Sequence, residues 1–396
     1  MLRGILLRLT LIFSAVLFVL VILEVGLRMT GVMCSGCAYL QRDPITGYTH
    51  IPEKLVVFNE EGYGIHRINR DGYDDSYYSL DKSPGTFRVA VLGDSIVEGL
   101  QVMPEMRFTE ILEKDLAVEV LNFGLGSSGT DIQLLRWRHK VRQYQPDAVI
   151  LIFTESNDVS DNAPQVFGIS LPGEEPNFVI AGGVLQMKIA VAVRGQYIQE
   201  VGSLWGVAKR WIRANLFLGR LLSLVPSLLP GDVSTRTGTF QAFPPNEAPQ
   251  SLVIQDEDCL DDDDYLYGWA TPWAGVSCHP YFAEALDVTE ALILALRAEV
   301  ENSGARFLLV SVSDCETSID YDYSKGSIPN YSLTERLEVF TQNSGIDFLP
   351  LVHGFSVYSD PRQLYINCPG HLSQDGHKVA AGLIKSFLME HNVLPG

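Results

Sequence analysis

Ser95 and His371 are the two side chains of this sequence whose types and positions suit nucleophilic catalysis. Ser95 ends the tripeptide Gly93-Asp94-Ser95, which directly follows the apolar run 88–92, and His371 precedes a C-terminal segment with helical periodicity. A serine hydroxyl is a weak nucleophile at neutral pH, so a neighbouring imidazole must take its proton and later return it to the leaving group. The pair therefore predicts acyl transfer through a serine nucleophile and a histidine base.

Amide groups between these two positions are suited to bind the charge of a tetrahedral intermediate. The glycine- and serine-rich loop 123–130 exposes backbone N–H groups, and Asn157 lies just beyond the apolar run 147–153. Preorganised donors at such an oxyanion are each worth roughly 2.7–4 kcal/mol. We expect the loop amides and the Asn157 side chain to supply them.

The elements that must bring these residues together read as buried parallel strands separated by helices. The expected strands span 88–92, 118–122, 147–153, 306–313 and 346–351, and the expected helices span 104–116, 130–143, 282–303, 334–341 and a final segment that starts near Ser373, a good N-cap. Continuous apolar strands are typical of a sheet covered on both faces. In open α/β sheets, ligands bind at the carboxyl ends of the strands. The pattern predicts a three-layer α/β/α sandwich with a flavodoxin-like parallel sheet of order 2-1-3-4-5.

The order of these motifs resembles the SGNH/GDSL hydrolase superfamily, whose four blocks carry serine, glycine, asparagine and histidine. The resemblance covers about residues 65–160 and 300–392. It implies Ser95 as nucleophile and His371 as general base, and it implies no cofactor and no metal. It also implies three oxyanion donors: the backbone N–H of Ser95, a loop N–H and the Asn157 side chain. Ser127 stands where the family's glycine usually lies, with Gly126 as the next candidate.

Two further departures from the family pattern bear on the chemistry. Glu155 replaces a glycine in the third block and is expected to crowd the site or to add a carboxylate beside it. The aspartate that usually precedes the histidine is replaced by Cys368 and Pro369. Loss of such an acid costs on the order of 10⁴ in turnover in serine proteases, so either a dyad suffices or another acid substitutes. Asp314 is the candidate substitute, and a turn residue is its alternative reading.

The first 30 residues form a separate segment. Arg3 and Arg8 accompany an apolar stretch from Ile5 to Leu27, close to the length of about 20 residues that a bilayer requires. We expect an uncleaved membrane anchor, with a cleaved signal peptide as the alternative, and a catalytic part outside the cytoplasm. The expected organisation is an anchor at 1–30, a lead-in at 31–85, a hydrolase core at 86–161 and 286–392, and an inserted cap or lid at 162–285.

The six cysteines form an even set, as expected for an oxidising compartment. The expected disulfides are Cys34–Cys37, Cys259–Cys278 and Cys315–Cys368. The last pair would tie the loop before His371 to the end of the fourth strand and could orient the histidine where the usual aspartate is missing. Zinc or redox chemistry is the alternative for Cys34 and Cys37, although no second pair of metal ligands accompanies them.

Charge and the insertion narrow the range of partners. The formal charge of −19, from 29 basic and 48 acidic residues, argues against a nucleic-acid partner.

The insertion contains three segments with more than one reading. Segment 207–225 reads as a basic amphipathic helix that either packs on the core, covers the site or lies on a membrane. The acidic run 256–264 reads as a solvated face, with calcium binding as the alternative. Trp269 and Trp273 are candidates to stack on sugars or to pack inside the insertion.

The sequence thus predicts a membrane-anchored, extracytoplasmic serine esterase. The expected substrate is an acylated small molecule or glycan, with an O-acetylated polysaccharide as the first candidate, and acyl transfer to a glycan is a close variant. A lipid or lysophospholipid esterase is the second reading. A catalytically weak domain that binds carbohydrate or assists assembly is the third, motivated by the missing acid and by Glu155.

Overall fold

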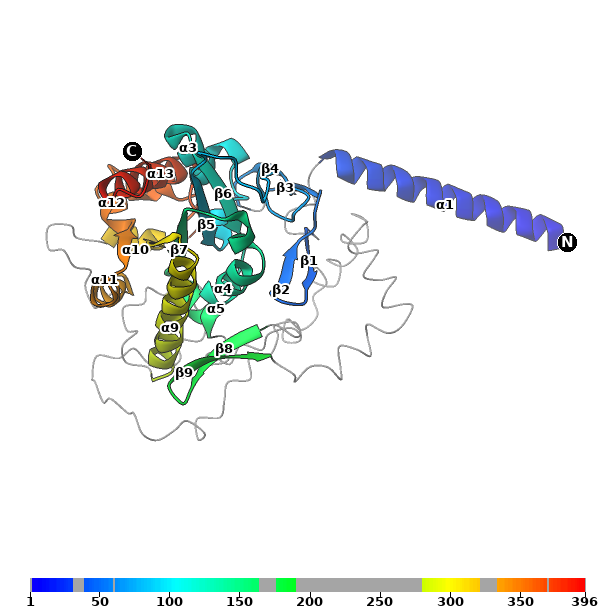
Figure 1. Ribbon diagram of the computed structural model, residues 1–396. Helices are drawn as coiled ribbons and strands as arrows, with labels where there is room; N and C mark the ends of the chain where they lie inside the picture. The colour runs from blue at the N-terminus through cyan, green and yellow to red at the C-terminus, as the bar shows by residue number, and fades with distance from the viewer. Residues whose placement is uncertain are drawn as a thin grey trace, which may run out of the picture.

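Five parallel strands form the central sheet of the protein. The computed structural model describes residues 2–30, 39–59, 61–163, 176–189, 280–320, 333–368 and 370–395. Across the sheet the strands are β11 (Asp347–Pro350), β10 (Arg306–Val312), β7 (Ala148–Thr154), β5 (Arg88–Gly93) and β6 (Glu119–Gly124). Figure 1 labels β5, β6 and β7 of this sheet. If the five strands are numbered 1 to 5 along the chain and read from the β6 edge, their order in the sheet is 2-1-3-4-5. The predicted strand order is therefore confirmed.

The register of the sheet brings the predicted site residues to one edge. β5 lies between β6 and β7, every residue of β5 and β7 is buried, and Gly93 pairs with Gly124. Because parallel strands end on the same side, the turns after β5, β6 and β7 lie next to one another.

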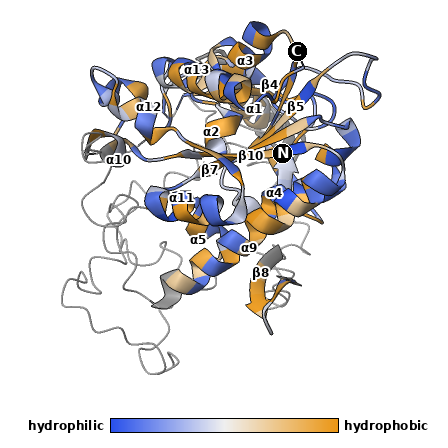
Figure 2. Ribbon diagram, turned by 60° about the vertical axis from the view of Figure 1, so that its left-hand side comes forward, coloured by the Kyte–Doolittle hydropathy of each residue, from blue (hydrophilic) through white to orange (hydrophobic). Residues whose placement is uncertain are grey.

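Helices cover both faces of this sheet. The helices are α2 (Ser95–Glu98), α3 (Phe108–Leu116), α4 (Thr130–His139), α5 (Asp158–Asn162), α9 (Pro280–Asn302), α10 (Cys315–Asp320), α11 (Leu333–Ser344), α12 (Val352–Ser356) and α13 (Gln374–Glu390), with short 3-10 turns at Pro104–Met106, Val141–Tyr144 and Pro361–Leu364. One buried cluster joins the sheet to α4, α5, α9 and α11, and a second joins it to α3, α12 and α13. Figure 2 shows the apolar strands enclosed between helices that carry both apolar and polar residues. The predicted three-layer arrangement is present.

Two predicted helix boundaries differ in detail, and a third agrees. The helix expected from Pro104 is divided, because Arg107 adopts an extended backbone between the 3-10 turn and α3. The helix expected to reach residue 143 ends at His139, where Lys140 leaves the helical region. Ser373 caps α13 as predicted, and its hydroxyl accepts the Gly376 N–H at 3.2 Å.

The lead-in contributes two small antiparallel hairpins that pack on the core. β1 (Leu40–Asp43) pairs with β2 (Gly47–His50), and β3 (Leu55–Phe58) pairs with β4 (Gly64–Arg67). The second hairpin buries Val56 and Phe58 together with Leu100, which follows the nucleophile turn. The lead-in is therefore in direct contact with the part of the core that carries Ser95.

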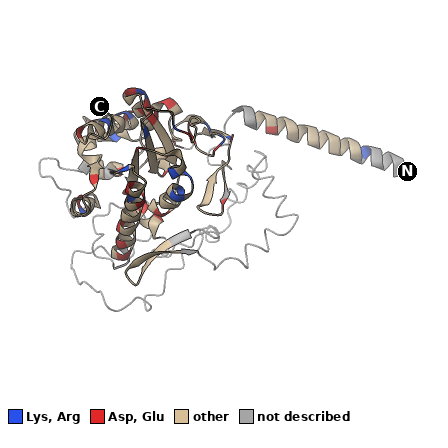
Figure 3. Ribbon diagram, viewed as in Figure 1, with Lys and Arg blue, Asp and Glu red and all other residues tan. Residues whose placement is uncertain are grey.

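The N-terminal segment forms the helix α1 (Leu2–Thr30), drawn mostly in tan in Figure 3 because few of its residues are charged. Large apolar side chains between Leu11 and Val25 are exposed. Within the described part of the chain, no helix meets the length and apolarity that crossing a membrane requires, so the predicted transmembrane helix is not supported.

Only part of the predicted insertion is described. The hairpin of β8 (Pro176–Ala181) and β9 (Val184–Ile189) buries Phe178 in the cluster that includes α9. The predictions for segments 207–225 and 256–264, for Trp269 and Trp273, and for the pairs Cys34–Cys37 and Cys259–Cys278 lie outside the described residues. The predicted Cys315–Cys368 disulfide is present, with a Cα–Cα distance of 5.3 Å.

Candidate active site

Ser95 is the first residue of α2, in the tight turn that leaves β5. The preceding Asp94 is buried, and its carboxylate accepts the Ile96 N–H at 2.9 Å and the Thr154 hydroxyl at 3.0 Å. Gly93 must be a glycine here, because an added Cβ would lie 2.3 Å from Val97. These contacts hold the turn so that the half-buried Ser95 side chain stands at the sheet edge.

The structure brings Ser95 and His371 together across 276 positions of the chain. Ser95 Oγ lies 2.8 Å from His371 Nε2. His371 precedes α13, and its carbonyl oxygen accepts the Ile366 N–H at 2.9 Å. The distance lies within the range for direct proton transfer between a nucleophile and its base.

Glu61, from the loop between β3 and β4, takes the position of the missing acid. Its Oε2 lies 2.6 Å from His371 Nδ1, and its Oε1 accepts the backbone N–H of His371 at 2.9 Å. A carboxylate facing Nδ1 fixes the tautomer in which Nδ1 carries a proton and Nε2 is free to accept one from Ser95. The arrangement is therefore a serine–histidine–glutamate triad in geometry.

The candidate acid Asp314 was a wrong choice. Its carboxylate accepts the Thr317 N–H at 2.7 Å and caps the start of α10, so it serves as the turn residue of the alternative reading. The sequence offered no signal for Glu61, because the residue precedes the recognised blocks and is one of 48 acidic residues. Only the packing of the lead-in against the turn after β5 brings it to His371.

Glu61 and His371 each shift the pKa of the other. The hydrogen bond from His371 is the largest influence on Glu61 and, against the effect of burial, holds the pKa of the carboxylate below its usual value. For His371, burial acts to lower the pKa, but the hydrogen bond to Glu61 and the Glu61 charge outweigh it, and the pKa lies above 6.5. The imidazolium form of His371 is thus stabilised by Glu61.

The loop after β6 approaches Ser95 from the other side. An added Cβ on Gly126 would lie 3.7 Å from the Ser95 Cβ. The Gly126 N–H donates to Glu98 Oε2 at 3.1 Å, and the Leu125 N–H donates to the Gly93 carbonyl at 3.1 Å. Ser127 is exposed and has a φ of 58°, a left-handed conformation that a glycine would adopt more easily. Because the Gly126 N–H already has an acceptor, the loop geometry favours Ser127 over Gly126 as the donor.

Asn157 lies beside the nucleophile turn but is engaged by carboxylates. Its Nδ2 donates to Asp94 Oδ2 at 3.2 Å and to Asp161 Oδ2 at 3.1 Å. An amide has two N–H donors, so both are in use in this arrangement. To serve an oxyanion, Asn157 must exchange or share one of these bonds.

The carboxylates around Asn157 are buried, and this changes their protonation. Burial, together with the nearby Asp94 charge, raises the pKa of Asp161 to about 7. Burial likewise raises the pKa of Asp94 and, more strongly, that of Asp158.

Within the described ranges, no group of histidine, cysteine, aspartate and glutamate side chains is arranged to hold a metal ion.

Glu155 does not crowd the site, contrary to expectation. Its side chain is 4% exposed, and Oε2 accepts hydroxyl hydrogens from Ser313 at 2.8 Å and Thr334 at 2.7 Å. Burial raises the pKa of this carboxyl. The residue thus links the ends of β7 and β10 to α11.

Comparisons with known proteins find matches at low similarity only. No protein-family model and no curated protein matches the chain. Solved structures that match include a lipolytic protein of the G-D-S-L family from Desulfitobacterium hafniense, at 12% identity over 76% of this chain and 100% of that one, with a TM-score of 0.37. They also include a lipase/acylhydrolase from Enterococcus faecalis, at 12% identity over 77% and 97% of the two chains, with a TM-score of 0.36.

An acetyl xylan esterase matches at 14% identity over 76% of this chain and 98% of that one, with a TM-score of 0.36. At these identities and scores the similarity carries no argument about substrate or activity. The chemistry must be argued from the site itself.

Proposed function

We propose that this protein is a serine ester hydrolase of SGNH type, with Ser95 as nucleophile, His371 as general base and Glu61 as the acid that orients the histidine. The observation that carries the proposal is the continuous line of hydrogen bonds from Ser95 Oγ through the imidazole to Glu61, at 2.8 and 2.6 Å. Three side chains from distant parts of the chain meet in the order that acyl transfer requires.

In the proposed reaction, Ser95 Oγ attacks the ester carbonyl while His371 Nε2 takes its proton. The resulting oxyanion is bound by the backbone N–H groups of Ser95 and Ser127, with Asn157 as the side-chain donor. The proton on Nε2 passes to the leaving alcohol, and an acyl-serine remains. Water, or a second alcohol in a transferase, then repeats the sequence with His371 as base. Glu61 stabilises the imidazolium in both halves.

The triad removes the reason for the inactive alternative. That reading rested on a missing acid and on Glu155, but Glu61 contacts His371 and Glu155 is hydrogen-bonded away from the site. An active enzyme is therefore the proposal that the geometry supports best.

The proposed location is outside the cytoplasm, with α1 as the membrane attachment. The Cys315–Cys368 disulfide supports an oxidising compartment, and the exposed apolar side chains of α1 between Leu11 and Val25 support association with lipid. In that location the proposed substrates are O-acyl, chiefly O-acetyl, groups on a carbohydrate, and transfer of the acyl group to a glycan hydroxyl is the variant. Fractionation of cells that express the full chain or a chain lacking residues 1–30 tests the attachment. Equal recovery of both forms in the membrane fraction would contradict it.

The activity is tested with a series of p-nitrophenyl esters from acetyl to dodecanoyl. We expect turnover that is lost in Ser95→Ala and is greatest for the acetyl ester. Turnover confined to long chains would move the proposal to a lipid esterase. A folded wild-type protein that cleaves none of the esters and releases no acetate from acetylated xylan would contradict the proposed activity.

A further inference from the structure

A second histidine–carboxylate pair is buried next to the loop after β6, which approaches Ser95. His50 on β2 and Glu98 on α2 are 0% and 2% exposed, and His50 Nε2 lies 2.6 Å from Glu98 Oε1. His50 Nδ1 lies 3.1 Å from the Gly72 carbonyl oxygen. Because a carbonyl can only accept, Nδ1 carries a proton, and a further proton must lie between Nε2 and Oε1. The pair is therefore neutral as a whole, which makes its complete burial tolerable.

The other oxygen of Glu98 holds the loop that approaches Ser95. Oε2 accepts the Gly126 N–H at 3.1 Å, and the N–H of the preceding Leu125 donates to the Gly93 carbonyl. Two successive amides are thus bound within the protein. Among the hydrogen bonds between described residues, none begins at the next amide, that of Ser127.

The Tyr48 hydroxyl contacts backbone carbonyl oxygens of the same loop. It lies on β2, two residues before His50, and its hydroxyl is 2.9 Å from the Gly126 carbonyl oxygen and 2.5 Å from that of Ser127. The β1–β2 hairpin therefore holds the loop both directly, through Tyr48, and indirectly, through His50 and Glu98.

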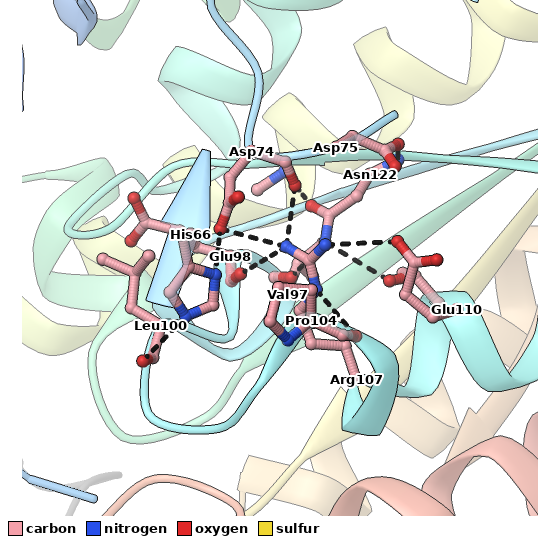
Figure 4. A network of polar contacts seen from close by, with 12 residues as sticks. His66, Asp74, Asp75, Val97, Glu98, Leu100, Pro104, Arg107, Glu110 and Asn122 are labelled. Atoms are coloured by element: carbon pink, nitrogen blue, oxygen red, sulfur yellow. Dashed lines mark hydrogen bonds and ion pairs between the residues drawn. The ribbon is translucent and has the colours of Figure 1, made fainter. Parts of the chain in front are cut away.

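The backbone of Glu98 is itself anchored by a buried network (Figure 4). Arg107, 2% exposed, donates to the Glu98 carbonyl at 3.3 Å and forms an ion pair with Asp74 at 3.0 Å. Asn122 donates from its side chain to the Val97 carbonyl at 2.7 Å. The carboxylate of Glu98 thus has a well-defined position from which to hold the loop.

We propose that Glu98, oriented by His50, is a positioning residue for the oxyanion-binding loop. It occupies the Gly126 N–H, which sets the peptide plane of the loop and leaves the Ser127 N–H for the developing oxyanion. This inference rests on the proposed esterase function. It adds that the lead-in hairpin is needed for transition-state stabilisation as well as for supplying Glu61.

The test compares Glu98→Gln with Glu98→Ala. Glutamine retains an oxygen for the Gly126 N–H and presents an N–H to His50 Nε2, so the hydrogen-bond geometry is kept and the pair remains neutral as a whole. We expect kcat on p-nitrophenyl acetate to fall about 100-fold in E98A, as for a displaced oxyanion donor, with KM changed less than about threefold, and to stay within about fivefold of wild type in E98Q. Equal losses in the two variants would show that the loss does not depend on the hydrogen bond that holds the loop, and would overturn the proposal. An unchanged kcat in E98A would overturn it as well.

Tyr48→Phe keeps the inference testable if E98A does not fold. The substitution removes one hydroxyl from a half-buried side chain, and we expect kcat to fall about tenfold with little change in KM or in the thermal midpoint. The matched control is Tyr77→Phe, whose ring is 49% exposed and lies against Arg70. Equal kcat in Y48F and Y77F would refute the positioning role. Ser95-dependent turnover by the wild type is measured first, so that failure of the esterase proposal is recognised separately.

Discussion

Replacing Glu61 by glutamine removes the charge that orients and stabilises His371 while keeping the size of the side chain. Glutamine cannot reproduce both native contacts: if its oxygen faces Nδ1, its NH2 group meets the His371 backbone N–H, and if its NH2 group faces Nδ1, the ring proton moves to Nε2. In the second arrangement the imidazole donates to Ser95 Oγ and cannot act as its base. We therefore expect a large loss in kcat with a small change in KM.

The size of the expected loss in kcat follows from the solvent exposure of the Glu61 and His371 side chains. A fully buried triad acid is worth about 10⁴ in kcat, or about 5 kcal/mol. Glu61 and His371 retain 22% and 30% of their side-chain exposure, so water partly replaces the lost carboxylate. We expect a fall of about 10²–10³ in kcat, equivalent to about 3–4 kcal/mol. Glu61→Asp, whose side chain is about 1.5 Å shorter, is expected to fall between wild type and glutamine.

The pH profile separates this role from a general loss of structure. The base must be neutral, so kcat/KM falls as pH drops through the His371 pKa, and in the wild type that limb lies above pH 6.5 because Glu61 raises the pKa. Without Glu61 the effect of burial remains, and the limb moves to lower pH in E61Q. Glu53→Gln is the control, since Glu53 lies in the same lead-in and is 62% exposed. If E61Q stayed within threefold of E53Q and kept the same acid limb, the triad reasoning would be refuted.

Two further predictions concern the surroundings of the triad. Asp161 has a folded-state pKa of about 7, so its ionisation destabilises the fold progressively as pH rises from about 4 to 7. Asp161→Asn is therefore expected to raise the free energy of unfolding at pH 8 by at most about 4 kcal/mol, and at pH 5 by only about 1.5 kcal/mol, as measured by urea denaturation. An equal change at both pH values would show that Asp161 does not titrate as described. The Cys315–Cys368 disulfide closes a loop of 53 residues, and its replacement by two serines is expected to cost about 4 kcal/mol of stability and to lower kcat by loosening the segment before His371. An unchanged kcat in the folded double variant would show that the disulfide does not orient the histidine.

The sheet could be predicted from the sequence because its strands are continuous apolar runs that end in recognisable turns. Strands 88–92 and 147–153 are buried on both faces, and the residues after them were expected at one edge for that reason. The meeting of Ser95 with His371 was predicted from the family resemblance of the motif that precedes the C-terminal helix. Helix ends were less predictable, because single residues such as Arg107 and Lys140 decide them through their backbone angles.

The acid of the triad could not be predicted, because the contact depends on tertiary packing alone. Glu61 is 310 positions from His371 and lies in a loop between two short strands whose pattern carries no catalytic signature. The same is true of the hydrogen bond from the Gly126 N–H to Glu98, which occupies one of the two neighbouring amides proposed as oxyanion donors. Glu155 was misjudged because its place in a motif says nothing of the direction of its side chain, which the hydroxyls of Ser313 and Thr334 determine.

The most direct test of the central claim is the site and rate of reaction with a fluorophosphonate. We predict that the probe modifies Ser95, as located by peptide mass spectrometry, and that the rate falls by orders of magnitude in His371→Ala and in Glu61→Gln. Modification of another residue, or an unchanged rate in both variants, would contradict the claim that Ser95, His371 and Glu61 act as one catalytic unit.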